Sequence, residues 1–157
     1  MEAMARVRRN GLTRHIGVSN FTVPLIDEAV AVSPEPIVTN QVEFHPYLDQ
    51  TKIMDACRRH GISITAYCPI ARAKVIGDPV MEEIAARHSR NPVQVALRWL
   101  VQQPGVIAIP RTSSKTRLAE NLDIDGFSLM DDEMAAIADL ARPDGRIVNV
   151  AWAPEWD

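Results

Sequence analysis

Short apolar runs alternate along the chain with longer amphipathic segments, and this alternation constrains the fold more than any other feature. Four runs have the length and the β-branched or apolar content of strands, namely residues 15–18, 37–44, 62–67 and 105–110. Segments with helical spacing of apolar residues lie before, between and after them. Strands that alternate with helices are parallel and are joined by right-handed crossovers. The pattern predicts an α/β fold, and both an open sheet and a closed barrel fit it.

The helical segments have recognisable ends. Asn10-Gly11 is a stop signal for a helix over residues 1–9. Thr22 can cap the helix that runs to Val32, with a proline in its first turn. Asn91 is the expected cap of a strongly apolar helix. Further helices are expected over residues 50–60, 79–88, 114–122 and 131–140.

Composition excludes several classes of protein. A chain of 157 residues with 46% apolar residues is expected to form one globular domain, residues 1–157. A net charge of −3 predicts no nucleic-acid partner, and no apolar run has the roughly 18 residues of a membrane helix. Two cysteines cannot build a disulfide framework, so a cytoplasmic location is expected. The four histidines lack metal-ligand spacing, and no metal is expected.

Polar residues follow the predicted strands at their carboxyl ends, where parallel sheets bind ligands. Ser19 and Asn20 follow the first strand and Gln41 lies in the second, so their hydroxyl and amide groups can serve a carboxamide. Alternatively, Ser19 and Asn20 cap the next helix and Gln41 bonds to neighbouring backbone. Tyr67, at the end of the third strand, either stacks on a flat heterocycle or fills the mouth of a barrel. Cys68 is interpreted as a small packed residue and not as a nucleophile.

The segment after the fourth strand is the most informative. Hydroxyl groups and cations gather over residues 110–121, where a strand meets a helix N-terminus. Arg111 and Arg117 can both donate charge-assisted hydrogen bonds to one phosphate. A solvated charged turn is the alternative, but a phosphate site is favoured because barrel phosphate sites recur after the last strands.

Four motifs, in order, resemble those of the aldo-keto reductase family. Residues 11–21 (GLTRHIGVSNF) resemble its "GlvraIGVSNF" signature, and residues 40–48 (NQVEFHPYL) resemble its "NQVEyHPYL" segment. Residues 66–70 (AYCPI) are similar to its "aYsPLg" segment. Residues 109–121, which begin IPRTS and end in Glu120 and Asn121, resemble its "IPKS…R…EN" segment. Residues 21–25 and 153–157 further resemble the bacterial 2,5-diketo-D-gluconate reductase branch of the B type.

The resemblance implies the C-terminal half of an eight-stranded TIM (β/α)8 barrel, with these strands corresponding to the family's fifth to eighth. It implies NADPH-dependent reduction of aldehydes or ketones, and keto-sugar acids are candidate substrates. The cofactor-binding residues that it implies are Ser19, Asn20 and Gln41 at the nicotinamide carboxamide, Tyr67 stacked on the nicotinamide ring, Cys68 and Ile70 along the pyrophosphate, Arg111, Thr112 and Arg117 at the adenosine 2′-phosphate, and Glu120 and Asn121 at the adenine. The chain departs from the family at Arg111, where lysine is usual, and at Cys68, where serine is more frequent.

No residue of the chain matches the family's catalytic Asp, Tyr, Lys and His, which belong to the first four strands. Tyr47 lies in a loop, Tyr67 is assigned to stacking, and no lysine lies at a strand end beside a tyrosine. When a hydride adds to a carbonyl carbon, the carbonyl oxygen needs a proton donor. The chain alone is therefore expected to be inactive. Its expected partners are a small carbonyl substrate and either a missing N-terminal half or a second copy, and a non-catalytic NADP-binding half-barrel or a decayed remnant are the alternatives.

Overall fold

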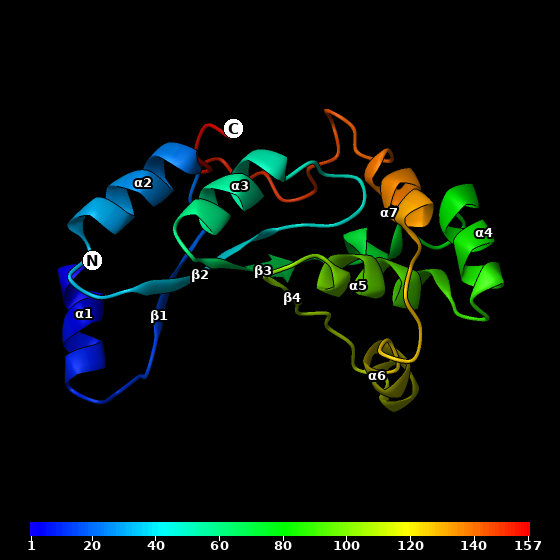
Figure 1. Ribbon diagram of the computed structural model, residues 1–157, viewed down its shortest axis with the longest axis horizontal. Helices are drawn as coiled ribbons and strands as arrows, with labels where there is room; N and C mark the ends of the chain where they lie inside the picture. The colour runs from blue at the N-terminus through cyan, green and yellow to red at the C-terminus, as the bar shows by residue number, and fades with distance from the viewer. The chain divides into compact units, whose positions relative to one another are not determined.

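The computed structural model describes residues 1–157 as a parallel four-stranded sheet with helices before, between and after the strands (Figure 1). The strands are hydrogen-bonded in the order β1-β2-β3-β4, so β1 and β4 are the edge strands. The elements are, in chain order, α1 (Glu2–Arg9), β1 (Ile16–Ser19), α2 (Val23–Val32), β2 (Ile37–Glu43), α3 (Thr51–Arg59), β3 (Ser63–Tyr67), the 3₁₀ turn η1 (Ala71–Ala73), α4 (Pro79–Arg87), α5 (Pro92–Gln102), β4 (Val106–Ala108), α6 (Lys115–Leu122) and α7 (Asp131–Ala138).

The predicted α/β alternation is thus confirmed, and the predicted helices and strands end within about two residues of the observed ones. The chain forms two compact units. Unit 1 comprises Met1–Val42, Gln50–Thr65 and Asn149–Asp157. Unit 2 comprises Glu43–Asp49 and Ala66–Val148. None of the helices combines the length and the apolar character that crossing a membrane requires.

In unit 1, β1 pairs with β2 and the register jumps between Ile16 and Val18, which pair with Ile37 and Asn40. Gly17 lies at this irregularity because β2 approaches it closely. A Cβ atom at residue 17 would lie 2.7 Å from the Thr39 Cγ2 and 2.8 Å from the Thr39 carbonyl oxygen. Only glycine therefore fits this register, which brings Ser19 opposite Gln41.

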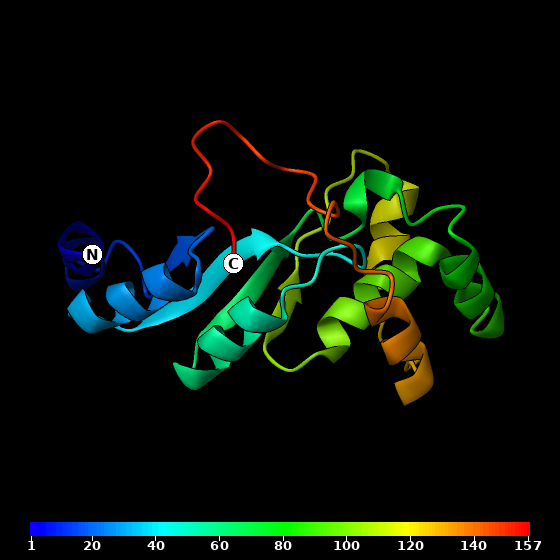
Figure 2. The same cartoon turned by 90° about the horizontal axis from the view of Figure 1, so that it is seen from above.

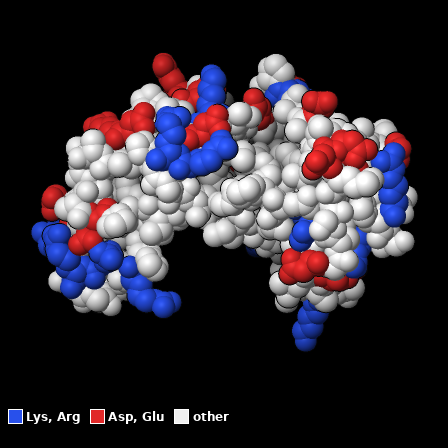
Figure 3. Space-filling model, in the orientation of Figure 1, with Lys and Arg blue, Asp and Glu red and all other residues white.

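Helix α2 packs against α3, and α1 contacts β1. Basic side chains gather over α1, whose last turn holds Arg6, Arg8 and Arg9 (Figure 3). The predicted cap of α2, Thr22, lies at the N-cap, but its side chain makes no capping hydrogen bond. The Val23 N–H instead donates to the Asp157 carboxylate at 2.9 Å, which places a negative charge at the start of α2.

In unit 2, α5 packs against β4, α4 and α6, and α4 also contacts α7. The turns of these helices are visible from a second direction in Figure 2. The ring of Trp99 meets Phe44 edge-on with centroids 5.4 Å apart, and the Trp99 indole N–H donates to the Met134 carbonyl. Asn91 forms the predicted cap of α5 as part of a capping box with Gln94. The apolar residues Val95, Ala96, Leu97, Trp99 and Leu100 of α5 are buried.

Candidate functional site

The predicted carboxamide-binding residues lie together in unit 1. The Ser19 hydroxyl and the Asn20 N–H both donate to the Gln41 backbone carbonyl, each at 2.9 Å. Asn20 has a φ of 57°, a left-handed conformation that asparagine tolerates better than most residues. Neither Ser19 nor Asn20 is the N-cap of α2, which is Thr22. The capping alternative is therefore wrong, whereas the alternative that the Gln41 side chain bonds to neighbouring backbone stays a prediction.

Asn40 holds this loop in place, a role that the sequence interpretation missed. Its side chain is fully buried, accepts a hydrogen bond from the Phe21 N–H at 3.3 Å and donates to the Phe21 carbonyl at 2.9 Å. An amide side chain can satisfy both groups of one residue because it carries a donor and an acceptor. In the sequence, the signal for this role was an asparagine within a predicted strand, because a polar side chain that becomes buried there must find hydrogen-bond partners.

In unit 2, Tyr67 ends β3 and its carbonyl accepts from the Phe44 N–H at 3.2 Å. Cys68 follows with a φ of 51°, and η1 continues with three consecutive left-handed residues, Ala71, Arg72 and Ala73. Consecutive left-handed residues are uncommon because the Cβ atoms crowd the carbonyl oxygens. This turn was not predicted, since no glycine or asparagine in the sequence marks it.

A cavity of about 250 Å³ in unit 2 gathers six of the predicted cofactor residues. Its lining combines apolar side chains with guanidinium, hydroxyl, carboxylate and amide groups. The lining residues are Ile70, Ala73, Ile76, Asn91, Pro92, Val93, Arg111, Thr112, Arg117, Glu120 and Asn121. Apolar walls combined with a few polar groups are typical of small-molecule sites.

Helix α6 forms part of this cavity although none of its side chains is buried. The Ser114 hydroxyl caps it by accepting from the Arg117 N–H at 3.3 Å. Gln94 of α5, itself buried, holds its far end by donating to the Glu120 and Asp123 carbonyls at 3.2 and 3.0 Å. Polar contacts, not apolar packing, therefore set the position of α6.

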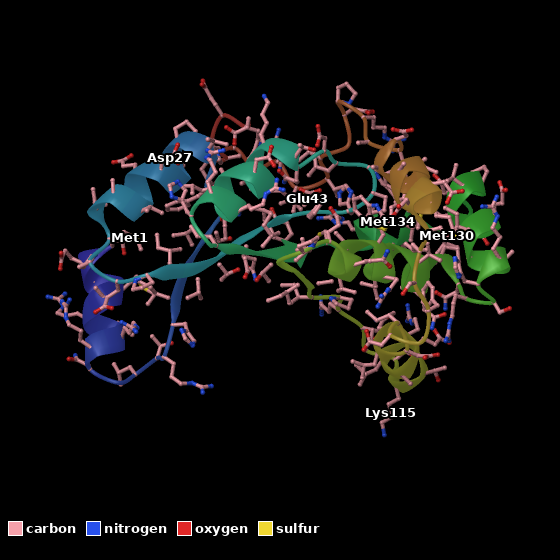
Figure 4. The ribbon with its side chains drawn as sticks, viewed as in Figure 1. Met1, Asp27, Glu43, Lys115, Met130 and Met134 are labelled. Carbon is pink, nitrogen blue, oxygen red and sulfur yellow. The ribbon has the colours of Figure 1, made fainter.

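The charges of the cavity favour an anion. Arg111 and Arg117 form no ion pair with a carboxylate of the chain, unlike Arg90 and Arg98, which pair with Asp123 and Asp125. Lys115 also carries a positive charge, but it does not line the cavity, and its side chain extends away from α6 (Figure 4). Two unpaired guanidinium groups beside a helix N-terminus can hold a phosphate.

Tyr47 is buried, and its hydroxyl lies 3.0 Å from an Asp78 carboxylate oxygen and 3.1 Å from the Lys74 carbonyl. Burial raises the pKa of Tyr47 far above its usual value, and the hydrogen bond and charge of Asp78 raise it further, while Arg142 acts weakly against them. A phenol in this state is a poor general acid at neutral pH. Tyr47 is an anchor for the loop that ends at Asp78.

The histidines serve structural contacts. His45, His60 and His88 lie against the carboxylates of Glu43, Asp27 and Glu133 at 2.9, 2.7 and 2.8 Å. His88, at the end of α4, thereby links that helix to α7. No group of three or more His, Cys, Asp or Glu side chains can hold a metal ion.

Comparison with known proteins gives the family. Residues 1–142 match the model of the aldo/keto reductase family. The chain is 40% identical over 158 aligned positions to methylglyoxal reductase DkgB of Escherichia coli O157:H7, covering 100% of this chain and 59% of that protein. It is 36% identical over 145 positions to glyoxal reductase of Bacillus subtilis, covering 92% of this chain and 52% of that protein. The chain thus spans little more than half the length of these curated relatives.

Solved structures agree. A crystal structure described as a putative 2,5-diketo-D-gluconic acid reductase B superposes with a TM-score of 0.95 at 53% identity, covering 97% of this chain and 54% of that one. A mutant of Gox0644 in complex with NADPH superposes with a TM-score of 0.89 at 36% identity, covering 94% of this chain and 54% of that one. The predicted resemblance is confirmed: this chain belongs to the aldo/keto reductase family.

Proposed function

We propose that residues 1–157 are the NADPH-binding, C-terminal half of a carbonyl reductase of this family. The observation that carries the proposal is the cavity of unit 2, which Arg111 and Arg117, without carboxylate partners, line together with Thr112, Glu120 and Asn121. The guanidinium and hydroxyl groups can donate to the 2′-phosphate of NADPH, and the Glu120 carboxylate and the Asn121 side chain can accept from the adenine amino group. Ile70, Ala73 and Pro92 give the same cavity the apolar surface that a nucleobase requires.

The remaining predicted cofactor residues are proposed for the roles that the family resemblance implies. Ser19, Asn20 and Gln41 would hold the nicotinamide carboxamide. The Ser19 hydroxyl already donates to the Gln41 carbonyl, so its lone pairs remain available to accept. Tyr67 would stack on the nicotinamide, and Cys68 with Ile70 would lie along the pyrophosphate, where backbone N–H groups of the left-handed turn are close in sequence.

NADPH, when bound, supplies a hydride to the carbonyl carbon of a substrate. The residues of this chain bind and orient the cofactor, but none donates a proton to the carbonyl oxygen. Tyr47, the only tyrosine besides Tyr67, is held by Asp78 and has a strongly raised pKa. Catalysis therefore requires a proton donor from a segment outside residues 1–157, and we infer that the chain alone is inactive.

The names of the relatives support small carbonyl compounds as substrates of the completed enzyme. Two relatives are named for methylglyoxal and glyoxal, and one structural neighbour for 2,5-diketo-D-gluconic acid. All three compounds carry adjacent or paired carbonyl groups, so we propose dicarbonyl compounds, keto-sugar acids included, as the substrate class. Both cysteines are free thiols, which supports the proposed cytoplasmic location.

The test replaces both Arg111 and Arg117 with alanine and compares NADPH with NADH by cofactor fluorescence titration. NADH lacks the 2′-phosphate, so the double variant should lose about 10- to 100-fold in NADPH affinity and less than about threefold in NADH affinity. Lys115→Ala is the matched control, because it removes a cation from the same helix but outside the cavity. Equal losses for the two cofactors, or an equal effect of Lys115→Ala, would contradict the proposal.

A second candidate is a non-catalytic NADP-binding half-barrel that associates with another copy. The sheet supports it, because β1 and β4 are edge strands and β4 and the residue after it expose Ile107 and Ile109. This candidate shares the cofactor site and differs in its partner.

A further inference from the structure

Asn40 lies in the middle of β2, and its side chain is fully buried. Successive side chains of a strand point to opposite faces, so Asn40 faces away from its neighbours Thr39 and Gln41. The Thr39 hydroxyl lies 2.8 Å from the Thr65 hydroxyl, whereas the Asn40 side chain forms a hydrogen bond with the Cys57 thiol of α3. Asn40 therefore points toward α3 and does not share the face of the sheet that carries Gln41.

The amide group of Asn40 has partners on both of its polar atoms, all within unit 1. Its Oδ1 atom accepts from the Phe21 N–H at 3.3 Å, and its Nδ2 atom donates to the Phe21 carbonyl at 2.9 Å. The contact with Cys57, itself only 1% exposed, adds a partner from α3. A buried amide is costly unless such partners satisfy it, so these contacts fix the orientation of the Asn40 side chain.

The backbone conformation of Asn20 is fixed at both of the peptide groups that flank it. The Asn20 N–H donates to the Gln41 carbonyl at 2.9 Å, and the next N–H along the chain, that of Phe21, donates to the Asn40 side chain. Because peptide groups are planar, the orientations of these two groups set the φ and ψ angles of Asn20. A φ of 57° persists in a residue other than glycine where its surroundings impose it. Asn40 supplies one of the two hydrogen bonds that do so.

This turn directs the side chains that are proposed for the nicotinamide carboxamide. Ser19 precedes the left-handed residue, and its hydroxyl donates to the Gln41 carbonyl at 2.9 Å. If Asn20 took a right-handed or extended conformation, the peptide group between Asn20 and Phe21 would rotate, and the Asn20 side chain would leave its present direction. Asn40 can therefore act on the carboxamide site from the opposite face of the sheet, without contacting the carboxamide.

We propose that Asn40 is a positioning residue, whose side-chain amide holds Asn20 in its left-handed conformation and thereby directs Ser19 and Asn20 toward the nicotinamide carboxamide. The effect on the cofactor rests on the proposed NADPH function. The effect on the conformation of Asn20 rests only on the hydrogen bonds of Asn40.

The first test examines the turn by NMR in the chain without cofactor. Asn40→Leu keeps about the size of the side chain but removes its donor and its acceptor, so hydrogen exchange of the Phe21 amide should accelerate by about tenfold or more. The NOE between the amide and α protons of Asn20, which is strong in a left-handed residue, should weaken. Thr65→Val is the matched control, because it also removes a side-chain hydrogen bond of unit 1 and keeps the shape of the side chain. The control should leave both signals unchanged.

The second test compares the binding of NADPH with that of adenosine 2′,5′-bisphosphate by titration calorimetry. The bisphosphate carries the adenine and the 2′-phosphate but no nicotinamide. Asn40→Leu should weaken NADPH binding by about tenfold, because the carboxamide contacts are no longer preorganised, and should change bisphosphate binding by less than about twofold. A purely structural loss would weaken both ligands in parallel. Thr65→Val should leave both affinities within about twofold of the original.

A second variant covers the case in which Asn40→Leu does not fold. Asn40→Ser introduces no charge and no extra volume, and its shorter side chain carries a single polar atom instead of two. It should accelerate exchange of the Phe21 amide and weaken NADPH binding in the same direction as Asn40→Leu, again without weakening the binding of the bisphosphate.

The outcomes separate this inference from the proposed function. If the original chain binds neither NADPH nor the bisphosphate, the proposed function fails, and the NMR signals alone decide whether Asn40 holds Asn20. Unchanged signals at Asn20 and Phe21 in the Asn40 variants, or equal changes in Thr65→Val, overturn the conformational role. Changed signals, together with an NADPH affinity that falls no more than the bisphosphate affinity, overturn the role in positioning the carboxamide contacts.

Discussion

At the scale of single residues, left-handed backbone conformations mark the ends of two strands. Asn20 follows β1 directly and Cys68 follows β3 directly, with φ values of 57° and 51°. Such conformations cost free energy in residues other than glycine and persist where surrounding bonds impose them. The Asn20 N–H bonds to the Gln41 carbonyl, and the Cys68 carbonyl accepts from the Ala71 N–H at 2.9 Å. These hydrogen bonds set the direction of two residues assigned to the cofactor.

The two thiols should differ sharply in reactivity. Burial raises the pKa of the Cys57 thiol to about 11, and a hydrogen bond with the Asn40 side chain only partly opposes it. Cys68 is partly exposed. We expect one fast-reacting thiol per native chain with a disulfide reagent at about pH 8, and two in denaturant.

Single variants assign the fast thiol. Cys68→Ser should abolish the fast reaction and Cys57→Ser should preserve it, and NADPH should slow it if Cys68 lies along the pyrophosphate. Two fast thiols in the native chain would show that Cys57 is not buried in solution.

At the scale of elements, carboxylates join segments that the sequence separates. Glu133, in the first turn of α7, is almost completely buried and lies 2.8 Å from His88, at the end of α4. Its carboxylate also accepts from the Met130 N–H at 3.0 Å. Burial acts to raise the pKa of Glu133, but these hydrogen bonds and the charges of His88 and Arg87 outweigh it and hold the pKa below the ordinary value.

This lowered pKa predicts an acid-sensitive contribution to stability. The unfolded chain binds a proton at Glu133 more readily than the folded chain, so stability falls as pH falls. The contribution is present above the ordinary pKa of 4.5 and is lost as pH drops through the lowered folded value. Glu133→Gln should lower the free energy of unfolding by about 1–3 kcal/mol at pH 7.

Urea denaturation at several pH values checks this prediction. The difference between Glu133→Gln and the original chain should shrink as pH falls below 4.5. Glu43 should follow the same rule. Burial acts to raise its pKa, but hydrogen bonds from His45, Ile147 and Val148 hold the pKa below its ordinary value. A difference that is constant with pH would show that the carboxylate charge does not stabilise the α4–α7 contact.

At the scale of the whole molecule, the sheet has two edge strands, β1 and β4. The chain covers only 59% and 54% of the length of two relatives. Strand β4 and the residue that follows it expose Ile107 at 53% and Ile109 at 42%. Exposed apolar edges are templates for pairing with another chain. A complementary half or a second copy would cover them.

Purified alone, the chain should therefore associate. We expect light scattering after size exclusion to give a mass above the 17.4 kDa of one chain. Replacing Ile107 and Ile109 together with lysine should return the mass to that of a monomer, because charge on an edge strand opposes pairing. Leu12→Lys is the control, since Leu12 is exposed but lies outside the strands. A monomeric original chain with a cooperative thermal transition would exclude both association and a decayed remnant.

Local sequence predicted the element order and most helix ends. Asn91 formed its predicted cap because the capping residue and its partner, Gln94, are three positions apart. Thr22 is the predicted N-cap of α2, but the side chain that accepts at the helix start could not be predicted, because Asp157 is 134 positions away from Val23. The turn over Ala71–Ala73 carries no glycine signal, so tertiary contacts impose it.

The sequence by itself determined the α/β alternation, the family and the identity of the proposed cofactor residues, because periodicity and motif order are local properties. Only the tertiary structure decided that Arg111 and Arg117 line one cavity with Ile70, that Gln94 holds α6, and that Glu43 binds Ile147 and Val148. The first depends on which loop and helix border the same cavity, and the other two depend on which distant backbone groups a buried side chain meets. Burial makes such hydrogen bonds obligatory, but the sequence does not say which groups become neighbours.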